Sequence, residues 1–167
     1  MVDTIDNLWE AFAGESQANR KYTIYAMIAN DEGHPEVAKL FRAAAESENV
    51  HLMCHLRSLG DIGKTEENLE SAINGEKYEY TEMYPKFITK AKEEGMKEAR
   101  LCFNYAKNVE ERHEGMYREA LEAIRSGKKL ELRIYYVCQV CGNLEIDKVP
   151  KSCPVCGNPP EVFKEVR

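Results

Sequence analysis

The sequence predicts a mainly α-helical protein, in which a four-helix bundle is followed by a small domain of short strands and turns. Through residues 4–126, apolar side chains recur at three- and four-residue steps with few helix breakers, which is typical of amphipathic helices that pack together. From residue 134 onward the chain is rich in β-branched, aromatic and proline residues and has no helical period. We therefore predict a helical domain at residues 1–130 and a second domain at residues 134–167.

The first two helices are predicted at residues 4–30 and 35–59. Gly33 and Pro35 separate them, because glycine tolerates a positive φ after a helix and proline starts the next helix without losing a bonded amide. One face of each helix carries residues that recur with the helical period: Ile5, Leu8, Phe12, Glu15, Asn19, Tyr22 and Ala26 in the first, and Val37, Phe41, Ala44, Glu48, His51 and His55 in the second.

The third helix is predicted in two pieces, residues 66–73 and 76–94. Thr65 is a suitable N-cap for the first piece, and Gly75 indicates a bend between the two. Pro85 lies inside the second piece and removes an amide that a regular helix would bond, so we expect a kink there.

The fourth helix is predicted at residues 96–126. Short connections between four such helices favour a bundle. The periodic face of this helix carries Ala99, Phe103, Ala106, Glu110, His113, Tyr117 and Ala120.

The composition is that of a folded globular protein, with 43% hydrophobic residues, 31% charged residues and a net charge of −6. No apolar run approaches the roughly 18 residues that span a membrane, and the acidic first residues do not resemble a secretory signal. The acids and bases after residue 134 cancel, which disfavours a nucleic-acid partner because binding phosphates needs a basic surplus. We expect a cytoplasmic protein in a reducing setting, without membrane or nucleic-acid partners.

Three glutamates stand on helix faces that should be apolar. Glu15, Glu48 and Glu110 continue the periodic faces of the first, second and fourth helices. A buried, unpaired carboxylate is costly or becomes protonated, so each of them needs a partner of opposite charge. For any single position, a small rotation of the helix that lets the glutamate reach water is the alternative.

Two of these glutamates begin a Glu-x-x-His motif, Glu48 to His51 and Glu110 to His113. Positions i and i+3 share one face of a helix, so each motif directs a carboxylate and an imidazole toward one point. Two such motifs on separate helices, with one glutamate from each of two other helices, form the ligand set of paired metals in four-helix bundles. Carboxylate and imidazole suit iron or manganese better than structural zinc.

The third helix offers three candidate ligands, Glu76, Glu79 and Glu82. Glu79 is the first choice, and Glu82 lies three residues further on, on the same face. His55 follows His51 by four residues, but without the glutamate that a zinc protease motif requires. We therefore interpret His55 as a packing residue or as a support for the ligands.

The cysteines predict a second metal site. In a reducing compartment, paired Cys-x-x-Cys units favour a metal over disulfides, and four thiolates suit either zinc or a single iron. A domain of this size buries little apolar surface, so the metal would hold it together. The four ligands would be Cys138, Cys141, Cys153 and Cys156, whereas Cys54 and Cys102 are expected to be small buried hydrophobic residues.

These segments together make the chain resemble a rubrerythrin over nearly its whole length. The matching segments are residues 8–18, both Glu-x-x-His motifs, residues 79–85 and both cysteine units. The resemblance implies a ferritin-like di-iron bundle joined to a rubredoxin-like domain with one iron on four cysteines, where zinc would be the substitute. It further implies a peroxidase that reduces hydrogen peroxide in oxidative-stress defence, with electrons from a donor such as rubredoxin or an NAD(P)H-dependent reductase.

The resemblance also assigns roles to single residues. On reduction, one iron would exchange Glu82 for His51. Tyr22 would hydrogen-bond a ligand carboxylate, with a simple core tyrosine as the equal alternative. The implied ligands are the bridging pair Glu48 and Glu110, then Glu15 and Glu82 on one iron, and Glu79 and His113 on the other.

Members of this family are typically homodimers in which the tail of one chain approaches the di-iron site of the other, and some exchange helices. We therefore expect a homodimer with electron transfer between subunits. Two other functions stay open from the sequence. One is a ferroxidase or iron-storage bundle, and the other is a non-redox binding protein with a zinc ribbon.

Overall fold

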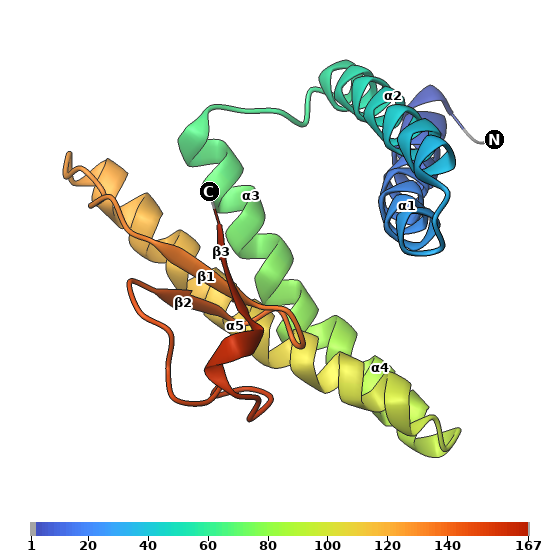
Figure 1. The fold of residues 1–167 in the computed structure, drawn as a ribbon. Helices are drawn as coiled ribbons and strands as arrows, with labels where there is room; N and C mark the ends of the chain where they lie inside the picture. Colours follow the sequence, from blue (N-terminus) through green and yellow to red (C-terminus); the bar gives the residue numbers. More distant parts are fainter. Residues whose placement is uncertain (1–2, 167) are drawn as a thin grey trace. The chain divides into compact units, whose positions relative to one another are not determined.

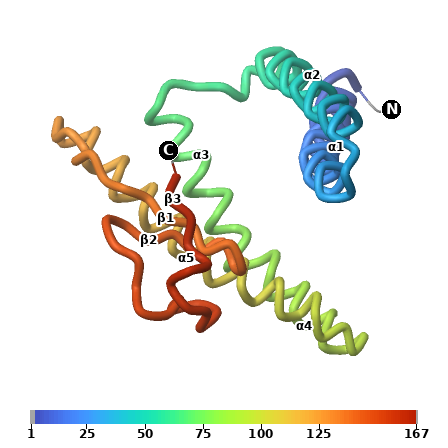
Figure 2. Tube along the Cα trace, viewed as in Figure 1, coloured from blue at the N-terminus to red at the C-terminus, as the bar shows by residue number. Residues whose placement is uncertain are grey.

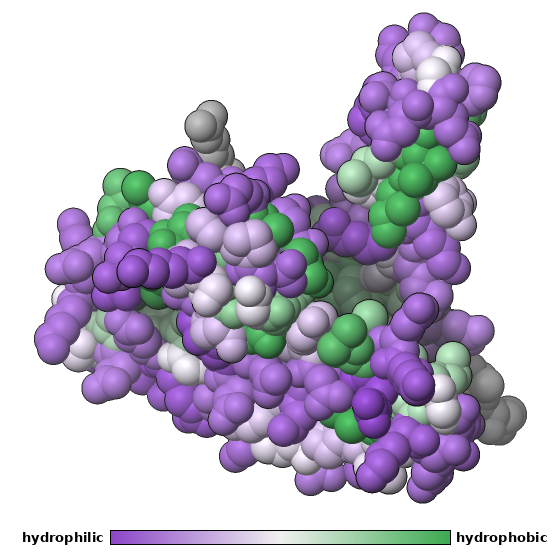
Figure 3. All heavy atoms as spheres, turned by 60° about the horizontal axis from the view of Figure 1, so that its bottom comes forward, coloured by the Kyte–Doolittle hydropathy of each residue, from purple (hydrophilic) through white to green (hydrophobic). Residues whose placement is uncertain are grey.

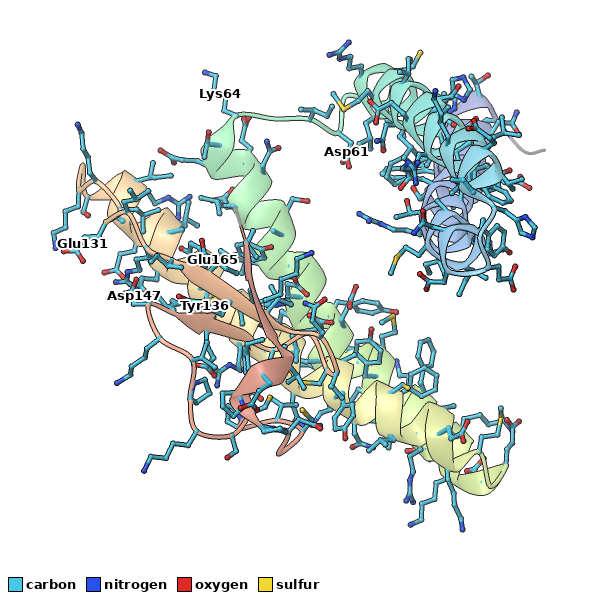
Figure 4. All side chains as sticks on the ribbon, viewed as in Figure 1. Asp61, Lys64, Glu131, Tyr136, Asp147 and Glu165 are labelled. Carbon is cyan, nitrogen blue, oxygen red and sulfur yellow. The ribbon has the colours of Figure 1, made fainter. Side chains whose placement is uncertain are left out.

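A computed structural model describes residues 3–166, which divide into two compact units between Gly63 and Lys64. Figure 1 shows the elements in chain order, and Figure 2 traces the path of the chain through them. The boundary lies in the connection between the second and third helices, where Figure 4 labels Asp61 and Lys64. The predicted class, mainly helical with a small C-terminal strand region, is confirmed.

The first unit is a hairpin of two long helices, α1 (Thr4–Asp31) and α2 (Pro35–Leu59). A capping box starts α1: the Asp3 carboxylate accepts from the Asp6 amide at 2.9 Å, and the Asp6 carboxylate accepts from the Asp3 amide at 3.3 Å. Gly60 ends α2 with a φ of 69°, a left-handed conformation that glycine adopts without steric cost. Both helices thus lie where the sequence predicts them.

Small side chains let α1 and α2 pack closely. Asn19 is buried between them, and its amide nitrogen donates to the Ala45 carbonyl oxygen at 2.7 Å and to Asn49 Oδ1 at 3.0 Å. Because a buried amide must be hydrogen-bonded, this contact favours one register of the two helices. Among the described residues of the hairpin, the buried apolar ones are alanines: Ala26, Ala29, Ala38 and Ala45.

The second unit contains the remaining helices, and α5 is its centre. Both α3 and α4 pack against α5. Buried Ile73, Ala91, Val109 and Leu121 contribute the apolar core of these helices. The elements are α3 (Thr65–Tyr78), the π-helix η1 (Glu79–Met83), α4 (Tyr84–Glu93) and α5 (Lys97–Arg125).

The start and middle of α3 correct the sequence prediction. Thr65 is already inside the helix, and the first turn is closed by the Lys64 amide, which donates to Glu67 Oε2 at 2.6 Å. Gly75 lies within α3 and does not end it. A glycine inside a helix costs only about 1 kcal/mol relative to alanine, a penalty that packing of α3 on α5 offsets.

The irregularity expected near Pro85 takes the form of the π-helix η1. Its wide turn closes through the Tyr84 amide, which donates to the Glu79 carbonyl oxygen five residues earlier. Pro85 follows in the first turn of α4, where a missing amide is tolerated. The extra residue per turn changes which side chains share a face across residues 79–83.

The C-terminal part is a three-stranded antiparallel sheet with the order β2-β1-β3. In the middle strand, Tyr136 lies opposite Glu145 on one side and Glu165 on the other; Figure 4 labels Tyr136 and Glu165. β2 contacts α5, so this small domain is packed on the helix that precedes it. The elements are β1 (Tyr135–Cys138), β2 (Leu144–Ile146), the 3-10 turn η2 (Pro160–Val162) and β3 (Phe163–Val166).

Large apolar side chains remain exposed on the chain, and Figure 3 shows such patches set among hydrophilic residues.

The prediction that Cys54 and Cys102 are buried is wrong, because both lie on helix faces that the chain leaves exposed. Within residues 3–166, no helix is both long and apolar enough to cross a membrane. Exposed residues of the hairpin include Ile24, Tyr25, Met27, Ile28, Val37 and Leu40.

Replacing Asn19 by alanine should lower the free energy of unfolding by about 1–3 kcal/mol, because two hydrogen bonds are lost inside the hairpin. Urea unfolding followed by circular dichroism measures the change. Asn7→Ala is the matched control, since Asn7 is exposed on the same helix and its loss should change stability by less than about 0.5 kcal/mol. Equal effects of the two substitutions would contradict the role of Asn19.

Candidate metal centres

A cluster of possible metal ligands lies in the hairpin of α1 and α2. Glu15, Glu48 and His51 bring one ligand atom each within 4.8 Å of one another. His51 Nδ1 lies 3.1 Å from Glu48 Oε2 and 3.6 Å from Glu15 Oε1. Glu48 and His51 share one face of α2 because they are three residues apart, and Glu15 reaches them from α1. We call these three residues the hairpin cluster.

The Glu15 carboxylate is incompletely satisfied. His55 Nε2 lies 2.9 Å from Glu15 Oε2, but this buried oxygen has no correctly aligned hydrogen bond from any described residue. Leaving a buried acceptor unsatisfied costs free energy, and a bound cation would remove that cost. The arrangement fits a metal held by the hairpin cluster, and it places His55 beside the ligands rather than in the helix packing.

A second cluster is built by α3 and α5. Glu76, Glu110 and His113 also place ligand atoms within 4.8 Å of one another, and we call them the α3–α5 cluster. His113 Nδ1 lies 2.7 Å from Glu110 Oε2 and 3.5 Å from Glu76 Oε1. The other ring nitrogen, His113 Nε2, is buried and has no hydrogen-bond partner in the part of the chain that the structure describes.

The α3–α5 cluster concentrates negative charge. Burial, followed by the Glu110 carboxylate, raises the pKa of both Glu76 and Glu79. The hydrogen bond with Glu110 raises the pKa of His113 against the opposing effect of burial. Burial and the same carboxylates also raise the pKa of the Tyr84 hydroxyl. A multivalent cation is the natural partner of such a set, because it neutralises carboxylates that otherwise repel one another.

The structure distinguishes the three glutamates of the third helical segment. Glu76 belongs to the α3–α5 cluster, and Glu79 is close enough for its pKa to respond to Glu110. Glu82 is more than half exposed, and its Oε2 pairs with Lys86 Nζ at 3.0 Å. From the sequence, Glu76 is the last of the three candidates. The periodic pattern does not reveal the π-helix at residues 79–83, which changes the faces on which these side chains lie.

The four cysteines of the tail form one compact group. Cys138 Sγ lies 3.6 Å from Cys156 Sγ, Cys141 Sγ lies 3.5 Å from Cys153 Sγ, and all four sulfur atoms are within 4.8 Å of one another. Four sulfur donors at this spacing fit a tetrahedral metal site. In each unit a glycine with positive φ follows the second cysteine, Gly142 at 81° and Gly157 at 74°.

Backbone and side-chain donors surround the thiols. Burial raises the pKa of Cys156, but hydrogen bonds from the Asn158 side chain and backbone, with those from the neighbouring thiols, outweigh it and lower that pKa to about 6. Asn158 Nδ2 lies 3.2 Å from Cys156 Sγ. Burial raises the pKa of Cys141 and of Cys153 instead. A metal binds thiolates, so it would take up the negative charge that these donors already stabilise.

Comparison with known proteins identifies the family. The profile of the family Rubrerythrin matches residues 6–121, and the profile of the rubrerythrin rubredoxin-like domain matches residues 136–164. The chain belongs to the rubrerythrin family. It carries the two kinds of metal site of that family, a di-iron carboxylate site and a rubredoxin-like four-cysteine site, and the clusters described above supply donors of the appropriate chemistry.

Individual rubrerythrins are similar along almost the whole chain. The rubrerythrin of Porphyromonas gingivalis is 36% identical over 98% of this chain and 90% of its own length. A putative rubrerythrin of Methanocaldococcus jannaschii is 34% identical over 98% of this chain and 93% of its own length. Among solved structures, nigerythrin in a partially reduced state has 31% identity and a TM-score of 0.58, covering 99% of this chain and 88% of that one. The match therefore includes both the helical part and the tail.

In the metal-free protein, the free energy of unfolding should fall as the pH rises between about pH 5 and pH 8. The pKa of His113 is raised in the folded protein. The stabilisation that follows from this is complete at pH values below 6.5, the ordinary pKa of histidine, and is lost as the pH rises through the pKa of the folded state. The raised pKa values of Glu76 and Glu79 act in the same direction, because the cost of ionising them in the fold begins above 4.5. Urea unfolding at several pH values measures the slope, and Glu76→Gln should make it shallower. A steeper decline in that variant would contradict the charge repulsion.

Removing the metal from the four-cysteine site should unfold the tail and leave the helices intact. The largest fully buried side chains are Asn143, Cys138 and Cys153, so two of the three are ligands and little apolar core remains without the metal. Hydrogen–deuterium exchange after chelation should show lost protection in residues 135–166 and retained protection in α5. Cys102→Ser, on a helix, is the control and should leave tail protection unchanged. A tail that stays protected without metal would refute this.

Proposed function

We propose that this rubrerythrin is a non-haem iron peroxidase that reduces hydrogen peroxide to water in oxidative-stress defence. The observation that carries the proposal is the presence, in one chain, of two carboxylate–histidine clusters and a four-cysteine site. The two carboxylate–histidine clusters would be superfluous in a binding protein with a zinc ribbon. The four-cysteine site would be superfluous in an iron-storage bundle.

The ligands proposed for the di-iron site are those that the family resemblance assigns. Glu48 and Glu110 are the bridging carboxylates, and His113 and His51 are the imidazole ligands. Glu76 joins the candidates because it lies 3.5 Å from His113 Nδ1. The full proposed set of ligands is Glu15, Glu48, His51, Glu79, Glu82, Glu110 and His113 at the iron pair, and Cys138, Cys141, Cys153 and Cys156 at the single iron.

Reduction of hydrogen peroxide to two water molecules consumes two electrons and two protons. Two ferrous ions bound in the clusters would supply one electron each and act as Lewis acids toward the departing oxygen. The carboxylates that would hold them repel one another in the absence of a cation, and this repulsion adds to burial in raising the pKa values of Glu76 and Glu79. Burial, followed by the carboxylates of Glu79, Glu110 and Glu76, raises the pKa of the Tyr84 hydroxyl.

The remaining elements of the proposal concern organisation and partners. The helical domain of residues 1–130 carries out the peroxide chemistry, and the domain of residues 134–167 relays electrons from a donor such as rubredoxin or an NAD(P)H-dependent reductase. The protein acts as a homodimer. Tyr22 packs on Phe41, with ring centroids 6.1 Å apart, and is proposed to hydrogen-bond a ligand carboxylate in the loaded site.

Glu110→Ala should reduce peroxide turnover at least about a hundredfold, because it removes a proposed bridging ligand and the partner of His113. Glu111→Ala is the matched control, since it removes the same charge from the next, exposed position of α5. Anaerobic mixing of the reduced protein with peroxide, followed by absorbance, measures both. Full activity of the Glu110→Ala variant would show that Glu110 is not a ligand of the catalytic iron site. A colourless, zinc-containing wild type would reject the redox function, and faster reaction with oxygen than with peroxide would favour a ferroxidase.

Glu82→Ala and His51→Ala test the proposed ligand exchange. In the structure Glu82 pairs with Lys86, whereas His51 lies in the hairpin cluster, so loss of Glu82 should leave the fold intact and impair turnover through the metal site alone. The measurements are turnover and the iron content of each variant. Lys86→Ala controls for the surface ion pair. Turnover of Glu82→Ala equal to that of Lys86→Ala and wild type would remove Glu82 from the site.

A further inference from the structure

The two cysteine units of the tail are built alike. Both have the sequence Cys-x-Val-Cys-Gly-Asn, beginning at Cys138 and at Cys153. In each unit the backbone amide of the first cysteine donates to the carbonyl oxygen of the asparagine, at 2.9 Å in the first unit and 2.7 Å in the second. The backbone amide of the same asparagine, Asn143 or Asn158, donates to the sulfur of the second cysteine. The two asparagines therefore occupy equivalent positions around the metal site.

The side chains of these two asparagines have different partners. Asn158 Nδ2 donates to Cys156 Sγ at 3.2 Å and so gives its own unit a further N–H···S hydrogen bond. Asn143 Nδ2 instead donates to Glu145 Oε1 at 2.9 Å. Because the two units share their spacing and their backbone hydrogen bonds, the Asn143 side chain can reach Cys141 Sγ in the way that Asn158 reaches Cys156. Two acceptors, Cys141 Sγ and Glu145 Oε1, therefore compete for one amide.

Glu145 is held in place from α5. Arg112 Nη2 donates to Glu145 Oε1 at 3.1 Å and to the Leu144 carbonyl oxygen at 3.3 Å. Val109, also on α5, is buried, and a Cβ atom at Gly142 would lie 4.0 Å from its Cγ1. The first cysteine unit, with the carboxylate beside it, is therefore the part of the tail that rests on the helix.

Two further observations indicate that Glu145 sets the orientation of Asn143. The position that corresponds to Glu145 in the second unit is Pro160, whose side chain offers no acceptor, and there the asparagine turns to its sulfur. Asn143 is completely buried, and its Oδ1 has no hydrogen-bond partner among the described residues. A buried acceptor without a partner costs free energy, and the hydrogen bond to the charged carboxylate offsets this cost.

We propose that Glu145, oriented by Arg112 of α5, is a positioning residue that keeps the Asn143 side-chain amide away from Cys141, so that the four-cysteine metal receives one side-chain N–H···S hydrogen bond instead of two. Hydrogen bonds to ligand sulfurs raise the reduction potential of bound iron, because they stabilise the reduced form, in which the sulfurs carry more negative charge. The contact with α5 thereby keeps the potential of the four-cysteine iron lower than two equivalent units would give. The inference concerns this site and does not depend on the peroxidase function.

Nuclear magnetic resonance tests the orientation in protein whose four-cysteine site holds NMR-active cadmium. An amide proton that is hydrogen-bonded to a ligand sulfur shows scalar coupling to the metal. In the wild type the side-chain amide of Asn158 should show this coupling and that of Asn143 should not, whereas both should show it in the Glu145→Ala variant. The Asn143 backbone amide should stay coupled in both proteins, which shows that the unit is intact. A coupled Asn143 side chain in the wild type, or an uncoupled one in the variant, would overturn the inference.

The reduction potential of the four-cysteine iron provides the second measurement. Glu145→Ala removes a negative charge together with the acceptor, whereas Glu145→Gln removes the charge and keeps an oxygen that can accept from Asn143. Glu145→Gln is therefore the matched control. The potential of Glu145→Ala should exceed that of Glu145→Gln by about 30–60 mV, a three- to tenfold shift in the one-electron equilibrium, which is the size expected for one hydrogen bond. Equal potentials, or a lower potential in Glu145→Ala, would contradict the proposal.

Arg112→Ala tests the link to α5. Without Arg112 the Glu145 carboxylate loses its partner on the helix, so the Asn143 side-chain amide should become coupled to cadmium in part of the molecules. Arg118→Ala is the matched control, because Arg118 lies on the same helix and pairs with Glu114 instead of the tail. Identical spectra of the two variants would show that Glu145 acts without α5, and would overturn that part of the inference.

Discussion

The structure depends on one electrostatic constraint: each cluster gathers two carboxylates and one imidazole, with their ligand atoms within 4.8 Å of one another. In each cluster a buried atom remains without a hydrogen bond, Glu15 Oε2 in one and His113 Nε2 in the other. In the α3–α5 cluster, burial and the Glu110 carboxylate raise the pKa values of Glu76 and Glu79, and the hydrogen bond with Glu110 raises that of His113, so these groups hold their protons more strongly. Bound iron would replace those protons.

The same constraint explains why the helices are built as they are. The Glu-x-x-His spacing places both ligand types on one face of a single helix, so α2 and α5 each need only one further carboxylate from a neighbouring helix. Alanines and the hydrogen-bonded Asn19 keep α1 close to α2. In the second unit, the π-helix η1 begins three residues after Glu76 and changes which of the following side chains share a face.

In the four-cysteine domain, metal ligands serve the stability of the domain itself. It is too small to have a large apolar core, and its most buried side chains include the ligands themselves. Its position on α5 relies on a few polar contacts from Arg112 and on the close approach of Gly142 to Val109. A single substitution at such a partly exposed contact should be enough to alter it. The position of the four-cysteine domain on α5 can therefore be tested by experiment.

The sequence alone determined the helical class, the limits of α1, α2 and α5, the cysteine ligands and the family resemblance, because helical periodicity and ligand spacing are local properties of the chain. It also singled out Glu15, Glu48, His51, Glu110 and His113, which the structure gathers into two clusters. Only the tertiary structure placed Glu76 in a cluster and Glu82 beside Lys86, exposed Cys54 and Cys102, and joined Arg112 to Glu145. These outcomes depend on a π-helix, on the faces that neighbouring helices cover, and on a contact between residues 33 positions apart, none of which leaves a periodic signal in the chain.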